Sequence, residues 1–338
     1  MNLLLVIAIV AGIVIMARVM NILQLSTRIA GDHDEMEELE KDGHINAALL
    51  LAFLAVGLFF FFYTIYIYMP LTLPEPASEH GVVTDNLLWI NFYIIIAVFI
   101  LTQIALFWFI YKYAYRKGQK AYFYPHNNKI EVIWTVIPTI VLAILVITGL
   151  RSWNQITQGK NDDGLNIQIY SKQFDFTARY PGSDNKLGNS YFKQITSDNP
   201  LGMITEDPAG ANDKMSNELH MVVNKPVKLH INSRDVLHSV YLPHFRAQMN
   251  AVPGMTTFFY FKPTITTAEM RRKTKNDKFD YVMLCNKICG VSHYMMNMKV
   301  VVETEAEYND WLAKQKDAMP KATTAGLNAP DEKVLTQK

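Results

Sequence analysis

The sequence predicts membrane α-helical hairpins followed by an exported all-β domain of the sandwich or barrel type. Half of the 338 residues are hydrophobic and only 19% are charged, against about 25% in a typical soluble domain. Residues 1–150 hold 8 Lys or Arg and 11 Asp or Glu, whereas residues 151–338 hold 24 and 20. From about residue 164 onward, long apolar stretches give way to short runs of alternating polarity.

The same composition excludes several classes of protein. A single soluble globule, a disordered chain and a coiled coil do not fit the apolar first half. The net charge of +1 provides no basic excess, so no nucleic-acid partner is expected. Only two cysteines occur, which excludes a disulfide-rich scaffold.

Four apolar stretches approach the roughly 20 residues that cross a bilayer. They are residues 3–25, 47–69, 87–111 and 132–150. The first is the weakest because Arg18 interrupts it, and a signal peptide is the alternative. It lacks a basic leading segment and a small-residue cleavage site, so we expect it to be retained as a helix.

Lys and Arg in the short loops predict the orientation of the spans. The loop 112–130 contains five of these residues and the loop 70–86 contains none. Loops rich in Lys and Arg stay in the cytoplasm. The segment from residue 151 onward is therefore expected outside the membrane.

Eight short runs in the exported half are predicted to be strands, which favours a sandwich or barrel. They are residues 166–170, 174–179, 219–223, 227–231, 237–241, 257–261, 279–284 and 298–302. Residues 224–226 predict a turn, because Pro226 cannot donate to a ladder. The polar stretch 181–217 predicts a long loop, residues 303–317 a short helix and residues 320–338 a solvated tail.

Soft metal donors are concentrated in one segment. Cys285, Cys289, His293 and Met296 fall within 12 residues, and His238 lies upstream in an Asp-Val-Leu-His run. Thiolate with thioether favours copper, since zinc sites rarely use methionine. Two thiolates can bridge two copper ions, each completed by one histidine and one weak ligand.

Simpler interpretations stay open for each residue taken alone. The two cysteines could form a disulfide in an oxidising compartment. His238 could be an ordinary hydrogen-bonded histidine, and Met295, Met296 and Met298 could fill the core. Together, Cys-x3-Cys-x3-His-x2-Met and the upstream histidine favour a metal site.

On these residues the chain resembles subunit II of haem–copper cytochrome c oxidase, which carries the binuclear copper A centre. The resemblance covers about residues 85–303. The family's copper motif appears at 285–296, its Asp-Val-x-His segment at 235–238 and its Ala-x-Pro-Gly turn at 251–254. Residues 131–138 resemble its second hairpin helix. The resemblance implies a cupredoxin-like fold for the exported domain.

The resemblance also implies the ligands and the activity. One copper would add His238 and Met296 to the bridging Cys285 and Cys289, and the other would add His293 and the backbone carbonyl of Lys287. The centre would take single electrons from a cytochrome c and pass them to the haems of the catalytic subunit. That partner of the respiratory chain reduces oxygen and translocates protons. No Cys-x-x-Cys-His occurs, so haem is expected only in the partner.

This interpretation divides the chain into five segments in a bacterial cytoplasmic (inner) membrane, with the copper domain on the periplasmic side. They are a first span with a cytoplasmic loop (1–45), a second span with an outer loop (46–86), a helical hairpin (87–151), the copper A domain (152–303) and a terminal helix with a tail (304–338).

Three further residues have roles only by resemblance. The family places a glutamate at the mouth of a proton-uptake pathway, which Glu131 matches, although an interfacial acid is the simpler interpretation. The family's Trp-Tyr-Trp cluster, where electrons enter, corresponds here to a run with Phe174 and Phe176. We expect both phenylalanines to keep an aromatic surface, with strand core as the alternative.

The chain departs from the family in other places. Lys287 replaces a glutamate that binds magnesium, and an ammonium cannot replace that ligand. The exported half has an excess of basic residues, so no strongly acidic face for a basic soluble cytochrome is evident. We expect a cytochrome donor that is either dedicated to this oxidase or tethered to it in a supercomplex. We expect the two additional spans and the loop 181–217 to contact a neighbouring complex or an accessory subunit. The alternative is that they only add packing within the membrane.

Three other functions remain. A nitric oxide reductase has a copper subunit with the same domain. A quinol oxidase has a related subunit that is structural and lacks copper. The full set of Cys, His and Met donors in this chain argues against that function. A disulfide-bearing membrane receptor would bind metal only incidentally.

Overall fold

The computed structural model describes residues 3–29, 35–116, 118–158 and 164–319. The chain divides into two compact units, which are described separately. The first comprises Met1–Pro70 and Ile94–Asn128, and the second comprises Leu71–Tyr93 and Lys129–Lys338. The solvated tail predicted at 320–338 lies outside the described residues.

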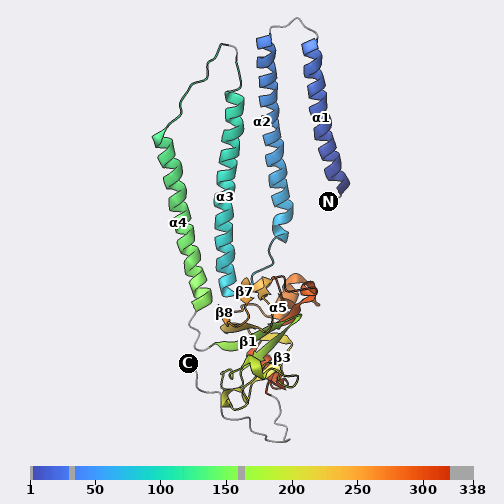
Figure 1. The fold of residues 1–338 in the computed structure, drawn as a ribbon, viewed down its shortest axis with the longest axis vertical. Helices are drawn as coiled ribbons and strands as arrows, with labels where there is room; N and C mark the ends of the chain where they lie inside the picture. Colours follow the sequence, from blue (N-terminus) through green and yellow to red (C-terminus); the bar gives the residue numbers. More distant parts are fainter. Residues whose placement is uncertain (1–2, 30–34, 117, 159–163, 320–338) are drawn as a thin grey trace. The chain divides into compact units, whose positions relative to one another are not determined.

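Long helices form the apolar half of the chain (Figure 1). They are α1 Leu3–Ile29, α2 Glu35–Tyr68, α3 Glu79–Lys112 and α4 Asn128–Gln158. Among the described residues, three helical segments are long and apolar enough to cross a membrane: Glu40–Leu71, Glu79–Lys112 and Asn128–Gln158. These confirm three predicted spans by length and composition. In α1 the described apolar stretch is the shorter Ala11–Leu23.

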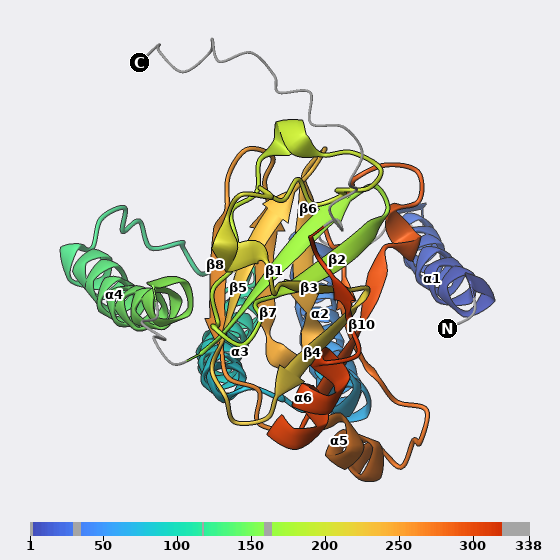
Figure 2. The ribbon, with the colours of Figure 1, turned by 90° about the horizontal axis from the view of Figure 1, so that it is seen from below.

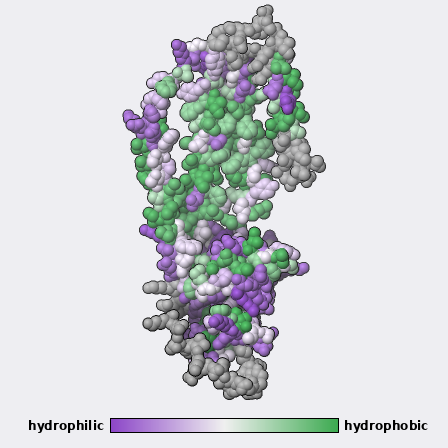
Figure 3. All heavy atoms as spheres, in the orientation of Figure 1, coloured by the Kyte–Doolittle hydropathy of each residue, from purple (hydrophilic) through white to green (hydrophobic). Residues whose placement is uncertain are grey.

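Apolar side chains cover the outside of these helices. Figure 3 shows hydrophobic residues gathered over the helical region and a mostly hydrophilic surface over the β-strands. Phe59, Leu101 and Val146 are typical, since each exposes more than half of its surface. Apolar side chains exposed to this extent are stable in lipid, whereas contact with water would be unfavourable for them.

Two sheets form the all-β part, which confirms the predicted sandwich (Figure 2). In the described residues the six-stranded sheet has the order β11-β3-β2-β1-β5-β8 and the five-stranded sheet the order β4-β10-β9-β6-β7. The strands are β1 Leu165–Lys172, β2 Asp175–Tyr180, β3 Lys214–Ser216, β4 Glu218–Val222, β5 Val227–Ser233, β6 His238–Leu242, β7 Ala247–Ala251, β8 Thr257–Phe261, β9 Tyr281–Leu284, β10 Asn297–Glu303 and β11 Lys316–Asp317.

Side-chain alternation explains why these segments pair. In β1, Ile167 and Ile169 are fully buried between the sheets, while Gln168 and Tyr170 lie on the opposite face. In β2, Phe176 and Tyr180 point inward. Strands with this alternation bury one face in a shared core and leave the other face polar.

The eight predicted strands are all present, with ends shifted by at most two residues. The predicted turn is also present, since Asn224 has φ of 59° and the Lys225 amide donates to the Val222 carbonyl. The prediction missed β3, β7, β11 and the helix α5 Thr267–Thr274. The predicted terminal helix is the shorter α6 Glu305–Leu312, which begins at a capping box of Thr304 and Glu307.

The segment before α3 is built into the β-strands of its own unit. The Ala77 amide donates to the His244 carbonyl at 2.7 Å, and Ser78 Oγ donates to the Phe245 carbonyl at 2.7 Å. Arg246 then donates two hydrogen bonds to Asp85 of α3, at 2.7 and 2.8 Å. These contacts anchor the start of α3 to the loop that follows β6.

Removing the charge of Asp85 tests this anchor. Both side chains of the pair are largely buried, with exposed fractions of 9% and 14%, so Asp85→Asn leaves the Arg246 guanidinium without its counter-ion. We expect a loss of roughly 3 kcal/mol in the free energy of unfolding, seen as a lower Tm of the full chain. The control Glu79→Gln removes an exposed ion pair with Lys262 and should cost less than about 1 kcal/mol. Equal Tm values for the two variants would contradict the anchor.

Candidate metal centre

The candidate centre lies in the loop between β9 and β10. The Cys285 amide donates to the Met296 carbonyl at 3.1 Å, which extends the pairing of Leu284 with Asn297 in the ladder. Cys285 and Met296 are therefore held by the sheet at the two stems of the loop. A single helical turn, His293–Met295, returns the chain toward the second stem.

The structure brings six predicted donors together. They are His238, Cys285, the Lys287 carbonyl, Cys289, His293 and Met296. The two Sγ atoms are 3.9 Å apart. His238 Nδ1 is 4.0 Å from Cys285 Sγ, and His293 Nδ1 is 3.7 Å from Cys289 Sγ. Met296 Sδ is 3.7 Å from Cys289 Sγ, and the Lys287 carbonyl oxygen is 3.2 Å from Cys285 Sγ.

These distances fit a metal rather than a disulfide. A disulfide needs its sulfurs about 2.05 Å apart, and both cysteines are free. Two metal–sulfur bonds of about 2.3 Å reach across as much as ~4.6 Å, so one ion can bind both sulfurs at 3.9 Å. Six donors also exceed the four positions of a tetrahedral ion, which favours two ions.

Burial makes the cluster depend on a cation. His238 is fully buried, Cys285 is 8% exposed and Cys289 is 5% exposed. Burial, with the neighbouring Cys285 thiol, raises the pKa of the Cys289 thiol above its ordinary value. Two adjacent buried thiolates repel each other, and a bound metal ion offsets that repulsion.

A carboxylate orients the His238 ring. His238 Nε2 donates to Asp235 Oδ1 at 2.7 Å, which leaves Nδ1 with its lone pair toward Cys285. Partial burial alone raises the pKa of Asp235, but hydrogen bonds from the Gln173 amide, His238 and the Val236 amide outweigh it and lower the pKa. Asp235 therefore accepts this hydrogen bond as a carboxylate.

Gln173 connects the two sides of the cluster. Its amide nitrogen donates to Asp235 Oδ2 at 2.7 Å, and its side-chain Nε2 donates to the Cys289 carbonyl at 2.6 Å. The turn between β1 and β2 therefore supports His238 through Asp235. It also contacts directly the loop that carries Cys289. The sequence prediction missed both supporting residues, although the Asp-x-x-His spacing could have indicated Asp235.

The two phenylalanines lie in different environments. Phe176 is only 2% exposed and belongs to the core, so the predicted surface position is wrong for it: β2 alternation turns it inward. Phe174 is half-buried and its ring lies against Gly290, where an added Cβ would be 2.9 Å from two ring atoms. Gly290 also has φ of +138°, so glycine is required beside Cys289.

Two other predicted residues stand apart from the donors. Glu131 lies exposed in the first turn of α4 and is not part of the cluster. Lys287 directs only its carbonyl oxygen to the cluster, while the residue as a whole is exposed. Replacing the family's glutamate by lysine therefore leaves the backbone donor in position.

Sequence comparisons place most of the chain in one family. Residues 67–152 match the family model "Cytochrome C oxidase subunit II, transmembrane domain", and residues 167–304 match "Cytochrome C oxidase subunit II, periplasmic domain". The alternative cytochrome c oxidase subunit 2 of Bradyrhizobium diazoefficiens is 33% identical over 285 residues, covering 83% of this chain and 94% of the relative. Cytochrome c oxidase subunit 2 of Thermostichus vulcanus is 27% identical over 71% of this chain and 77% of that protein.

A comparison of structures finds a solved periplasmic domain of subunit II of cytochrome oxidase from Bradyrhizobium japonicum. It is 21% identical and covers 46% of this chain and 94% of that chain, with a TM-score of 0.31. This score is too low to extend what the sequence comparisons show.

Asp235→Ala tests whether the carboxylate supports the donors. Without it His238 loses the partner that fixes its ring, and we expect copper affinity to fall about 10- to 100-fold, measured by competition with a chelator. Asp175→Ala is the control, because it removes an exposed acid from the neighbouring β2. Unchanged affinity in Asp235→Ala would show that His238 is not a ligand or needs no orientation.

Proposed function

The chain belongs to the cytochrome c oxidase subunit II family, and we propose that it accepts electrons for the oxidase through a binuclear copper A centre. In this proposal Cys285 and Cys289 would hold both ions. His238 and Met296 would complete the ligands of one ion, and His293 with the Lys287 carbonyl would complete those of the other. The observation that carries the proposal is the approach of two buried thiols to 3.9 Å among four further soft or neutral donors.

The bound copper pair supplies a one-electron couple. The chain's own residues keep the donors in place whichever charge the pair carries. Cys285 and Met296 are fixed by the β9–β10 ladder, and His238 begins β6. Asp235 and Gln173 hold the ring and the loop by hydrogen bonds. A frame of this kind changes little when an electron arrives or leaves, which favours fast transfer.

The surface of the loop supports partners beside the centre. Four large apolar residues there are exposed by more than 60%: Ile288, Val291, Tyr294 and Met295. Apolar residues gathered around a buried site are typical of an interface. We assign this surface to the catalytic haem–copper subunit and to the cytochrome c donor, which stays tethered in our proposal.

The family and the loop charges support the location that we propose. The chain is a multi-pass membrane protein of the bacterial cytoplasmic membrane in this proposal, and the copper domain faces the periplasm. The basic loop 112–130 supports that orientation. Glu131, at the start of α4, is assigned to the mouth of the proton pathway of the catalytic subunit.

A copper-free role in a quinol oxidase is not favoured. A subunit without copper does not require six convergent donors, and replacing its thiols would not change its function. The hydrogen bond that Gln173 donates to Cys289 and the one that Asp235 accepts from His238 would then orient residues that bind nothing.

Two substitutions separate the bridging from the terminal ligands. Cys289→Ser removes one bridge, so we expect the binuclear centre and its purple colour to be lost from the purified, assembled protein. Met296→Leu removes only a weak ligand and should keep about two copper ions per chain while shifting the reduction potential. Metal analysis and electron paramagnetic resonance measure both. A normal delocalised signal in Cys289→Ser would refute the bridge.

Phe174→Leu tests where electrons enter. The Phe174 ring touches Gly290, next to Cys289, so its loss should slow electron transfer from the cytochrome several-fold while copper content and spectrum stay normal. Phe258→Leu, at an aromatic position on β8 that is 37% exposed, is the matched control. If Phe174→Leu oxidises cytochrome at the wild-type rate, electrons enter elsewhere.

A further inference from the structure

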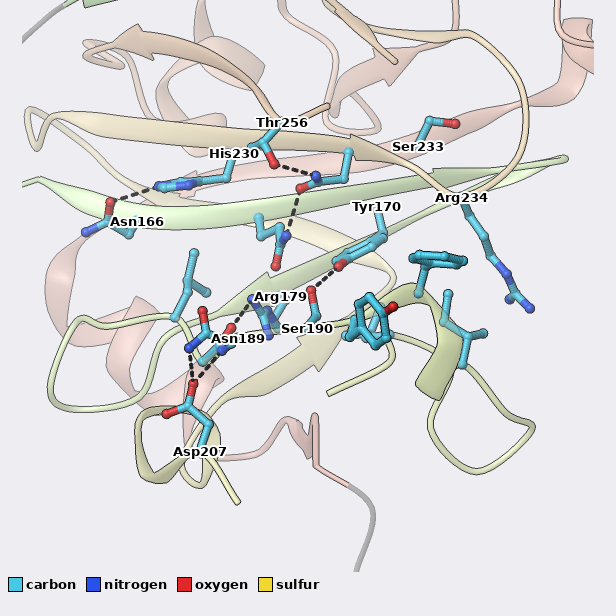
Figure 4. A pocket seen from close by; sticks show the side chains of 18 of the residues that line it. Asn166, Tyr170, Arg179, Asn189, Ser190, Asp207, His230, Ser233, Arg234 and Thr256 are labelled. Carbon is cyan, nitrogen blue, oxygen red and sulfur yellow. Dashed lines mark hydrogen bonds between the residues drawn. The ribbon is translucent and has the colours of Figure 1, made fainter. Parts of the chain in front are cut away.

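A polar cavity of about 1020 Å³ lies on the outer face of the six-stranded sheet. Its floor is formed by β1, β2 and β5, and part of the loop 181–217 forms its wall. Figure 4 shows Arg179, Asn189 and His230 around this space, together with hydroxyl groups from Tyr170, Ser190 and Thr256. The volume is at the upper end of the range for small-molecule sites, and the copper donors are not part of it.

Two buried polar atoms on the floor lack a partner. Gln168 is 7% exposed and Arg179 is 2% exposed. Gln168 Oε1 and Arg179 Nε have no hydrogen-bond partner among the residues the structure describes. Gln168 and Arg179 are also direct partners in the β1–β2 register. Two residues that each carry an unpaired polar atom are therefore neighbours across the β1–β2 pair, where burial makes an unpaired polar group costly.

The rest of the floor is already ordered by hydrogen bonds. Gln168 Nε2 donates to Asn232 Oδ1, and Asn232 Nδ2 donates to Thr256 Oγ1, both at 2.7 Å. The first of these hydrogen bonds occupies the side-chain nitrogen of Gln168, and together they fix the direction of its unpaired side-chain oxygen. Arg179 is held by the Gly188 carbonyl at 2.7 Å and by Asp213 at 3.4 Å. The floor is thus pre-organised for a ligand.

Charge on the floor is balanced. The buried Asp213 carboxylate compensates the Arg179 guanidinium. Asp207 accepts two hydrogen bonds from Asn189. Lys186 and Arg234 also line the cavity, and neither forms an ion pair with another residue that the structure describes. A neutral ligand group that both donates and accepts, such as a hydroxyl, matches Gln168 Oε1 and Arg179 Nε.

Aromatic rings complete the cavity. Tyr191 and Phe192 line it and expose 44% and 70% of their surface. Their ring centroids are 5.0 Å apart, with Lys193 6.0 Å from each. Flat apolar rings beside amides and hydroxyls suit a molecule with apolar C–H faces and many hydroxyl groups. We propose that this cavity binds a neutral sugar.

The test uses the assembled oxidase in a detergent without a sugar headgroup. Saturation-transfer NMR is recorded with cellobiose at about 10 mM, a range suited to weak binding. The wild-type protein should transfer saturation to the sugar. Phe192→Ala removes an exposed ring and Gln168→Met removes the free acceptor, so each should weaken binding about tenfold. The controls Phe123→Ala and Gln248→Met make the same changes outside the cavity and should bind normally.

The outcomes are distinct. No transfer to cellobiose, or equal transfer in both cavity variants, would overturn the proposal. Binding of glucuronic acid but not cellobiose would show that Lys186 and Arg234 select an anion, which also overturns it. Binding of tetra-alanine alone would assign the cavity to a peptide instead. Copper content is measured in parallel and should stay constant, so this result is independent of the copper function.

Discussion

The structure depends on holding two buried thiols side by side. At a sulfur–sulfur distance of 3.9 Å, Cys285 and Cys289 are too far apart for a disulfide and close enough for a shared metal. Burial raises the pKa of Cys289, so the pair needs a cation to be stable as thiolates. The strands, the short loop and the hydrogen bonds that involve Asp235 and Gln173 all support this one contact.

The β1–β2 hairpin has two roles in the same domain. At its turn, Gln173 ties Asp235 to the Cys289 carbonyl. In its strands, Gln168 and Arg179 form the floor of the polar cavity. At the other end of β6, the strand that begins at His238, Arg246 joins the sheet to Asp85 of α3. The metal donors and the start of α3 are thus positioned by the five-stranded sheet, and the cavity by the six-stranded sheet. Gln173 connects the two sheets beside the donors.

Much of the fold follows from local patterns in the sequence. Apolar runs predicted four spans, of which three are confirmed by length and composition, and alternation predicted eight strands, all of which are present. The strand β7 was missed because its buried positions are Ala247 and Ala251, which lack the branched or aromatic side chains typical of strands. Soft donors within 12 residues predicted the site, but the contact of Gln173 with Cys289 joins residues 116 positions apart. Phe176 was misplaced because analogy with the family outweighed the alternation of its own strand.

The most direct measurement of the central claim is copper X-ray absorption on the purified, assembled protein. In the proposed centre both sulfurs would bind both ions, so the spectrum should show two sulfur neighbours per copper at about 2.3 Å and a second copper close by. One sulfur neighbour per copper without a neighbouring metal, or a protein without copper, would contradict a shared binuclear centre.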